Sequence, residues 1–176
     1  MNQITVPAEP IPGGPWPLTE AEEGLWYAQR LDPGNPSFNC GHATWVDGVL
    51  DVDAFRATAE QGARECQSLA LFMRETPQGI EQWLDPARSP ALEIVDLLGA
   101  PDAAQRARAA MQQDMQTAID PLQGALARQI LFKLGPSAYG WYQRAHHLAK
   151  LQRRTQRRRG AQHQQHHAQP QRETTL

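Results

Sequence analysis

The sequence lacks the features that mark a secreted or membrane-spanning protein. Only two of its 176 residues are cysteines, Cys40 and Cys66, which is too few for a disulfide framework. The N-terminus has neither a basic segment nor an apolar core, so we expect no signal peptide. No apolar run approaches the roughly 18 residues that cross a bilayer. We therefore expect a reduced protein of the cytoplasm that makes no contact with a membrane.

Acidic residues are almost missing from the end of the chain. Seven of the 17 basic residues lie from Lys150 onward, but only one of the 19 acids does, Glu173. This gives the tail a formal charge of +6 and leaves −8 on the preceding residues, within a net charge of −2. The tail is rich in Arg, Gln and His and has almost nothing to bury. We expect residues 150–176 to be disordered.

The first half of the chain predicts a leader followed by alternating helices and strands. Residues 1–17 contain five prolines and two glycines, so they form an extended leader that cannot be helical. Thr19 with Glu22 three residues later predicts a capping box, at the start of a helix that ends near Leu31. The run FNCGHATWVDG predicts a strand, and Asp51 is the expected N-cap of a second helix.

The second half continues this alternation. Residues 68–85 predict two strands around a turn at 77–79, and LEIVDL predicts a short buried strand. Pro101 suits the first turn of a third helix. Its apolar positions recur every three or four residues, at Ala104, Ala107, Met111, Met115 and Ala118. A last hairpin is expected from LARQILFKL and YGWYQRAHHLA. This order of elements predicts a mixed α/β or α+β sandwich.

Two adjacent histidines, His146 and His147, are candidates for a functional site. If residues 141–148 form a strand, neighbouring side chains point to opposite faces, so the two imidazoles cannot share one cavity. An imidazole titrates near neutral pH and can pack structurally, bind a metal or transfer a proton. The pair by itself favours a structural role over catalysis and metal binding, and all three roles stay open at this point.

The residues around the pair resemble the condensation domains of nonribosomal peptide synthetases. PLTEAEEGLWYAQ is similar to their first core motif, and NPSFNCGHATWVDGVLDVDAF is similar to the strand and helix that follow. ARECQSLALFMRE lies where the second motif falls, and WYQRAHHLA leads into the third, His-His-x-x-x-Asp-Gly. The order and spacing fit over residues 10–149. The WYQRAHH run resembles the members that assemble siderophores.

The resemblance implies two chloramphenicol-acetyltransferase-like lobes arranged in a V, of which residues 18–149 would form the N-terminal one. It implies peptide-bond formation between groups held on the phosphopantetheine arms of partner carrier proteins. No cofactor would be bound directly by the domain. It also implies that His147, the second histidine of the motif, is catalytic and that His146 is structural.

The sequence departs from this family pattern in three ways. Leu151 and Gln152 stand where the third motif has Asp and Gly, and Ala70 stands where the second motif has Arg. A leucine cannot accept the charged hydrogen bond that the Asp accepts. No part of the sequence corresponds to the C-terminal lobe. We hypothesise a frameshift after Ala149, so that the tail is out-of-frame translation and the chain alone is inactive.

Two other functions depend on the tail. The arginines at 153–159 could bind nucleic-acid phosphates electrostatically, but no aromatic residue accompanies them and the rest of the chain is acidic. His163, His166 and His167 could bind a metal weakly, but no set of carboxylates or cysteines completes a site. We expect neither function, and nucleic-acid binding is kept as the alternative to a condensation-domain fragment.

Overall fold

The computed structural model describes residues 13–149. The predictions for the tail at 150–176 therefore lie outside the described residues, and the leader is described only from residue 13. The helices are α1 (Glu20–Leu31), α2 (Val52–Glu65) and α3 (Ala103–Met115). The strands are β1 (Trp16–Pro17), β2 (Asn39–Asp47), β3 (Leu71–Thr76), β4 (Gly79–Leu84), β5 (Leu92–Asp96), β6 (Ala127–Gly135) and β7 (Ala138–His146).

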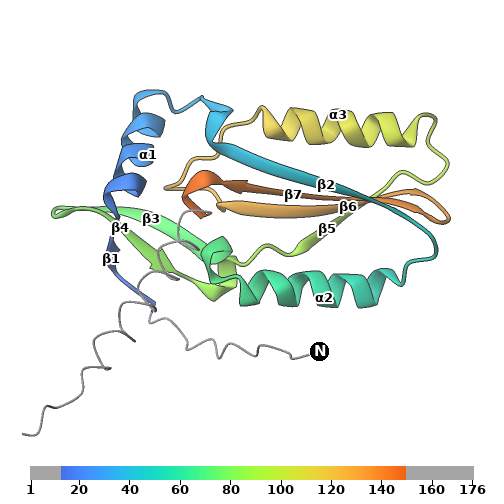
Figure 1. Cartoon of the computed structure of the whole chain (residues 1–176), viewed down its shortest axis with the longest axis horizontal. Coiled ribbons are helices and arrows are strands. Elements are labelled where there is room, and N and C mark those ends of the chain that lie inside the picture. Colours follow the sequence, from blue (N-terminus) through green and yellow to red (C-terminus); the bar gives the residue numbers. More distant parts are fainter. Residues whose placement is uncertain (1–12, 150–176) are drawn as a thin grey trace, which may run out of the picture.

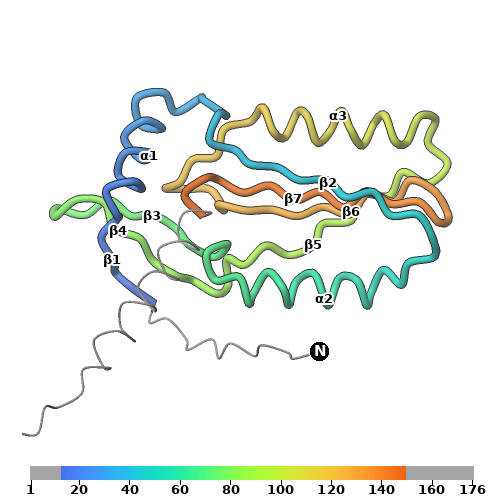
Figure 2. Tube along the Cα trace, in the orientation of Figure 1, coloured from blue at the N-terminus to red at the C-terminus, as the bar shows by residue number. Residues whose placement is uncertain are grey.

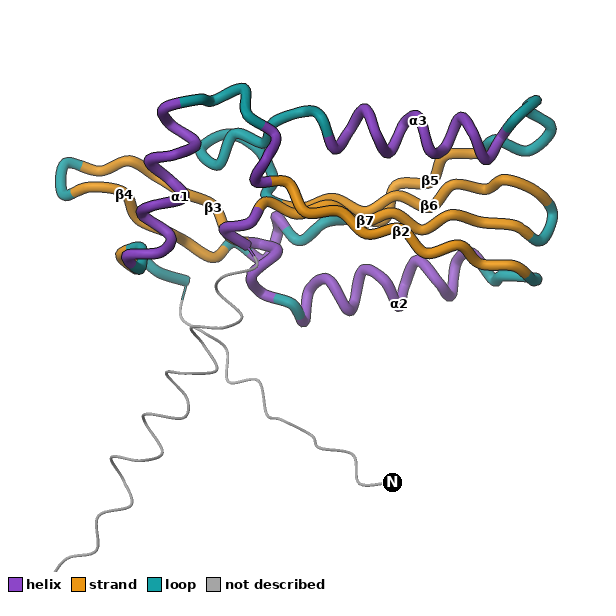
Figure 3. Tube along the Cα trace, turned by 45° about the horizontal axis from the view of Figure 1, so that its top comes forward, coloured by secondary structure: helices purple, strands orange, loops and turns teal. Residues whose placement is uncertain are grey.

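The strands form two sheets. β1, β4 and β3 make a three-stranded antiparallel sheet, whereas β2, β7, β6 and β5 make a four-stranded sheet in that order. In the larger sheet only β5 and β6 pair in parallel, and α3 lies in the crossover between them. α3 covers one face of this sheet and α2 covers the other (Figures 1 and 3). The predicted mixed α+β sandwich is confirmed.

Both helix caps predicted from the sequence are present. The Thr19 hydroxyl accepts the Glu22 N–H at 3.4 Å, and the Glu22 carboxylate accepts the Thr19 N–H at 2.7 Å, which completes the capping box. The Asp51 carboxylate accepts the N–H groups of Asp53 and Ala54 at 3.1 and 3.0 Å. These side chains satisfy backbone donors that have no partner within the helix, so α1 and α2 begin where they do.

The third helix differs from its prediction. Its N-cap is Asp102, which has a positive φ of 56° and makes no side-chain cap, so Pro101 lies before the helix and not in its first turn. Ala104 is exposed and Ala118 lies beyond the helix end. Ala107 and Met111 are buried as expected. The helix therefore packs through a narrower apolar stripe than the sequence spacing suggested.

β6 is buried on both faces. Ile130 and Phe132 pack with Met111 of α3, whereas Leu131 packs on the opposite face with residues of α2 such as Phe55. In the sequence alone, LARQILFKL alternates so that Leu126, Ile130, Phe132 and Leu134 share one face, with Arg128 as the exception, which indicates a single apolar face. The second buried face follows because the sheet is covered by a helix on each side, which requires apolar residues in both directions.

The last strand is central in the larger sheet. β7 pairs with β2 on one side and with β6 on the other, and the pairing with β2 runs from Asn39 opposite His146 to Asp47 opposite Ala138. The end of β7 lies close to α1 and to the smaller sheet (Figure 2). A cluster of buried side chains that includes Trp26, Leu126 and Leu148 fills this region. The histidine pair therefore lies where the two sheets and α1 meet.

Candidate functional site

The two histidines lie on different elements. β7 ends at His146, and residues 147–149 form a helical turn. The strand expected over residues 141–148 is therefore too long by two residues. The imidazoles are separated by this change of backbone direction as well as by the alternation of side chains along a strand.

His146 is held in the interior with both ring nitrogens occupied. Its side chain has no exposed surface, its Nδ1 accepts the N–H of Leu148 at 3.2 Å, and its Nε2 lies 3.3 Å from Oε1 of Gln29. Because Nδ1 is an acceptor, Nε2 has the proton and donates to Gln29. Burial, and to a lesser degree the charge of His147, lower the pKa of His146 to about 4. His146 is therefore neutral near pH 7.

Gln29 of α1 orients His146. Its amide nitrogen donates to the carbonyl oxygens of Asp32 and Pro33 at 3.1 Å and of Asn35 at 3.3 Å. These contacts fix which end of the amide faces the histidine, so the oxygen is the atom presented to Nε2. Gln29 is itself buried. The residue thus closes the loop after α1 and anchors the end of β7.

His147 is half-buried and contacts the first strand of the sheet. Its Nδ1 lies 3.3 Å from Sγ of Cys40, which is the second residue of β2 and is also half-buried. The neighbouring Asn39 is buried, and its amide donates to the carbonyl oxygens of Met115 and Thr117 at 2.9 and 2.8 Å. The beginning of β2 is therefore fixed against the chain that follows α3.

Asp114, near the end of α3, contacts three side chains of the larger sheet. Its carboxylate lies 2.7 Å from Nη1 of Arg128 and 3.0 Å from Nε of Arg144, and it accepts the Tyr142 hydroxyl at 2.9 Å. Arg144 also donates to the carbonyl oxygens of Asp114 and Thr117. Burial and the bond to Asp114 raise the pKa of Tyr142, so it stays a neutral donor. This network holds β6, β7 and α3 together.

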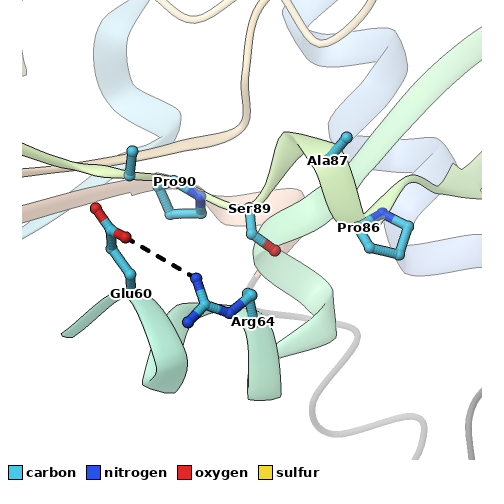
Figure 4. Close-up of a pocket in the computed structure, with 7 residues that line it drawn as sticks. Glu60, Arg64, Pro86, Ala87, Ser89 and Pro90 are labelled. Carbon is cyan, nitrogen blue, oxygen red and sulfur yellow. Dashed lines mark ion pairs between the residues drawn. The ribbon is translucent and has the colours of Figure 1, made fainter. Parts of the chain in front are cut away.

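Two surface cavities lie elsewhere. One of about 190 Å³ lies between the end of α2 and the turn at Pro86–Arg88, where Glu60 and Arg64 form an ion pair (Figure 4). The other, of about 220 Å³, lies between α3 and β2. Its lining residues are Gly41, His42, Ala43, Met111, Gln112, Met115 and Tyr142. Neither histidine of the pair lines either cavity, so the residues that suggest chemistry are outside both.

Sequence reasoning identified the two histidines but not the residues that hold them. Gln29 has no local signal, because its partner His146 is 117 residues away in the sequence. Asp114 did have a local signal in the sequence, because it lies one helical turn from Met111, on the face of α3 that packs against the sheet. Ala70, where an Arg was expected, is 1% exposed. No positive charge therefore comes from that position.

The part of the chain that the structure describes has neither a cluster of metal ligands nor a membrane-spanning helix. Within residues 13–149 no three side chains of His, Cys, Asp or Glu are grouped as metal ligands would be. No helix within that range has the length and apolar character of a membrane-spanning segment. The histidines proposed as weak metal ligands, His163, His166 and His167, lie outside the described residues.

A family model and known proteins match this arrangement. The model of the condensation domain matches residues 14–149. A dimodular nonribosomal peptide synthase of Bacillus subtilis is 32% identical over 132 residues, 75% of this chain and 6% of that protein. Enterobactin synthase component F of Escherichia coli is 29% identical over 134 residues, 75% of this chain and 10% of that protein. The chain is therefore similar to a small part of each relative.

A solved structure matches the fold as well. The crystal structure of the starter condensation domain of rhizomide synthetase RzmA superposes with a TM-score of 0.70 at 31% identity. The match covers 77% of this chain and 33% of that chain. The fold is thus that of a chloramphenicol-acetyltransferase-like lobe. The chain belongs to the condensation domain family of nonribosomal peptide synthetases, and it spans about a third of that solved domain.

Proposed function

We propose that this chain is the N-terminal lobe of a condensation domain, and that its parent enzyme forms an amide bond between two carrier-bound groups. The observation that supports this most is the difference between the two histidines. His146 is buried and neutral with both nitrogens occupied, whereas His147 is half-buried in the helical turn just beyond β7, with Nδ1 next to Cys40. His147 is the proposed catalytic residue, and His146 has the structural role.

The reaction makes a modest demand on His147. The amine nitrogen of the acceptor attacks the carbonyl carbon of the donor thioester, the C–N bond forms and the C–S bond breaks. A free α-amino group has a pKa of about 7.7–8.0, so much of it is already neutral near pH 7 to 8. His147 orients this amine, takes its proton as the bond forms and returns the proton to the leaving thiolate. The products are the amide and a free phosphopantetheine thiol.

The partners in this proposal are carrier proteins and a second lobe. The phosphopantetheine arms that hold donor and acceptor belong to the carriers, and the chain itself binds no cofactor. The C-terminal lobe would supply the other half of the active-site walls, so we propose that this chain has no condensation activity alone. Both described cysteines are free, which agrees with a parent enzyme in the cytoplasm. The match to enterobactin synthase component F supports a siderophore-type peptide as the product.

The domain boundaries are part of the proposal. The sequence predicts a lobe at residues 18–149 after a leader at residues 1–17, but β1 (Trp16–Pro17) pairs with β4, so we propose that the lobe begins before residue 18. Residues 150–176 are, in this proposal, the frameshifted tail. The coding DNA tests the last point, because a frameshift predicts a downstream condensation lobe in another reading frame after codon 149. If neither alternative frame encodes such a lobe, the frameshift is wrong.

A chimera tests the role of His147. Residues 14–149 would replace the corresponding segment of enterobactin synthase component F, and amide formation would be followed with carrier-loaded donor and acceptor. We expect His147→Ala to lower the rate by about 10²–10⁴-fold, the usual contribution of general acid–base catalysis. This chain without a second lobe should give no detectable amide.

Two controls make the result interpretable. His146→Gln keeps a side chain able to hydrogen-bond, so it should retain more activity than His147→Ala if the chimera folds equally well, judged by circular dichroism. An active His147→Ala chimera would contradict the catalytic role. Condensation by the unmodified chain alone would contradict its inactivity.

Nucleic-acid binding is the alternative function, and nothing in the matches to known proteins supports it. It depends on residues 150–176, which lie outside the described residues. A salt titration of binding with and without these residues separates the two proposals. Sequence-independent binding that weakens steeply with salt and disappears with the tail would favour the alternative.

A further inference from the structure

We propose that Cys40 is a positioning residue for His147. Its sulfur accepts a hydrogen bond from Nδ1–H of the imidazole and so leaves the lone pair of Nε2 free to take a proton. This inference rests on the function proposed for His147 and deepens it. Its starting point is the distance of 3.3 Å between Sγ of Cys40 and Nδ1 of His147.

The sulfur is fixed in space by the backbone around it. Cys40 lies opposite Ala145 in the antiparallel pairing of β2 with β7, and the neighbouring pair is Asn39 with His146. The Asn39 amide donates to the carbonyl oxygens of Met115, at the end of α3, and of Thr117, just beyond it, which prevents the beginning of β2 from shifting. A side chain with one rotatable bond on such a strand presents its terminal atom at a defined point.

The imidazole depends on this contact because it lies just beyond the strand. His146 is the last residue of β7, and the helical turn starts at His147, so the backbone that carries the second ring is outside the sheet pairing. Among residues 13–149, the hydrogen bond found for the His147 ring is the one with Cys40. The thiol is therefore the group that sets the orientation of the ring.

The tautomer follows from the chemistry of the two groups. A thiol is both a weak donor and a weak acceptor, so either Nδ1–H donates to sulfur or the S–H donates to Nδ1. Only the first arrangement leaves Nε2 unprotonated, as a base requires. The structure assigns the opposite tautomer to His146, whose Nδ1 accepts the Leu148 N–H. The two adjacent histidines would thus carry their protons on different nitrogens.

Nitrogen-15 NMR of the full chain tests this assignment without substrate. With ¹⁵N-labelled histidine near pH 8, well above the ordinary imidazole pKa of about 6.5, the long-range ¹H–¹⁵N correlations report the tautomer of each neutral ring. We expect the Nδ1–H form for His147 and the Nε2–H form for His146. A His147→Ala variant assigns the signals.

Substitutions at Cys40 provide the comparison. Cys40→Val replaces the thiol with an apolar side chain of roughly similar size that cannot hydrogen-bond, so the ratio of the two His147 tautomers should change by about two- to tenfold. Cys40→Ser should preserve the ratio, because its hydroxyl can accept the same hydrogen bond. His146 is the internal control, and its tautomer should be the same in all variants.

Each result either supports or overturns the proposal. A dominant Nε2–H form of His147 in the unmodified chain overturns it, and so does an unchanged ratio in a folded Cys40→Val variant. If Cys40→Val does not fold, the tautomer in the unmodified chain and in Cys40→Ser still decides. The readout needs no catalysis. An inactive chimera with the expected tautomers therefore counts against the proposed function and leaves the positioning by Cys40 intact.

Discussion

Two polar clusters hold the end of β7, and they use different chemistry. The Asp114 cluster consists of Asp114, Arg128, Tyr142 and Arg144, and it contains ion pairs. The Gln29 cluster consists of Gln29 and His146 with the carbonyl groups of residues 32, 33 and 35, and it is neutral. The first ties α3 to the larger sheet, and the second ties α1 to the same strand.

The difference follows the cost of removing charge from water. The Arg128 side chain is 36% exposed, so part of the ionic cluster keeps contact with solvent. His146 has no exposed surface, and a charge there would lose its hydration without a counterion. Burial therefore favours the neutral imidazole and its amide partner in the Gln29 cluster. The partial exposure of Arg128 permits a shared carboxylate in the Asp114 cluster. The clusters should respond differently to mutation and to pH.

The largest effect is expected from Asp114→Ala. The change leaves Arg144, whose side chain is 10% exposed, without its carboxylate partner. Breaking a buried ion pair by removing one partner typically costs about 3–5 kcal/mol, and we expect a loss of this size in the free energy of unfolding. Urea denaturation followed by tryptophan fluorescence measures it. Glu93→Ala, which removes the more exposed partner of Arg128, is the matched control and should cost far less.

The next effect concerns the Gln29 cluster and depends on pH. The pKa of His146 is about 4 in the folded chain against 6.5 ordinarily, so the unfolded state binds the proton first as the pH falls. The stabilisation is complete above about pH 6.5, decreases between pH 6.5 and 4, and amounts to about 3 kcal/mol when lost. Denaturation curves at a series of pH values measure this decline.

His146→Gln gives the control for that decline, because it removes the titrating group. Its unfolding free energy should vary much less than that of the unmodified chain between about pH 7 and 4.5. Equal slopes in the two proteins would mean that His146 is not the source of the pH dependence, and the contrast between the two clusters would then lose its electrostatic basis.

A smaller effect is expected from Gln29→Leu. The substitution keeps a side chain of similar length but removes the donor to three carbonyl groups and the acceptor for His146. Buried groups left without partners cost about 1–3 kcal/mol, and we expect a loss in that range. Hydrogen exchange should show the opening concentrated at the end of α1 and of β7. Gln61→Leu on the exposed face of α2 is the matched control, and its stability should change little.

The smallest effect is expected at the surface pair of Arg30 and Glu75. Both side chains are more than half exposed, and their charged atoms are 3.2 Å apart. Exposed pairs contribute about 0–1 kcal/mol, so Glu75→Gln should shift the urea midpoint only slightly. A loss as large as that of Asp114→Ala would show that exposure does not decide the value of an ion pair here.

The sequence predicted the local parts of this fold well. The caps at Thr19 and Asp51 were predicted from their neighbours, as was the hairpin that turns before Gly79, because each of these signals lies within a few residues. The start of the third helix was less well predicted, because Asp102 before it adopts a positive φ that cannot be inferred from the spacing of apolar residues. Caps and turns can be predicted from a sequence when the interacting residues lie within a few positions of each other.

The candidate site depends on contacts that a sequence pattern does not contain. The histidine pair was identified through its resemblance to a family motif, and its catalytic role stays a prediction. The contact of Cys40 with His147 joins residues 107 apart, and that of Gln29 with His146 joins residues 117 apart. Such pairs form only through the packing of β2, β7 and α1. The support of a site is therefore read from the structure, even where its central residues are visible in the sequence.

The central position of β7 has a consequence for how the chain is made. β2 is complete once residue 47 has been synthesised, but its partner strand lies at residues 138–146. During the intervening time β2 has an open row of backbone donors and acceptors, which is the condition under which nascent chains associate wrongly. If the ribosome paused before residue 138, β2 would be exposed without its partner strand. We expect β2 to find its partner only after residues 138–146, with His146 at their end, have left the ribosome.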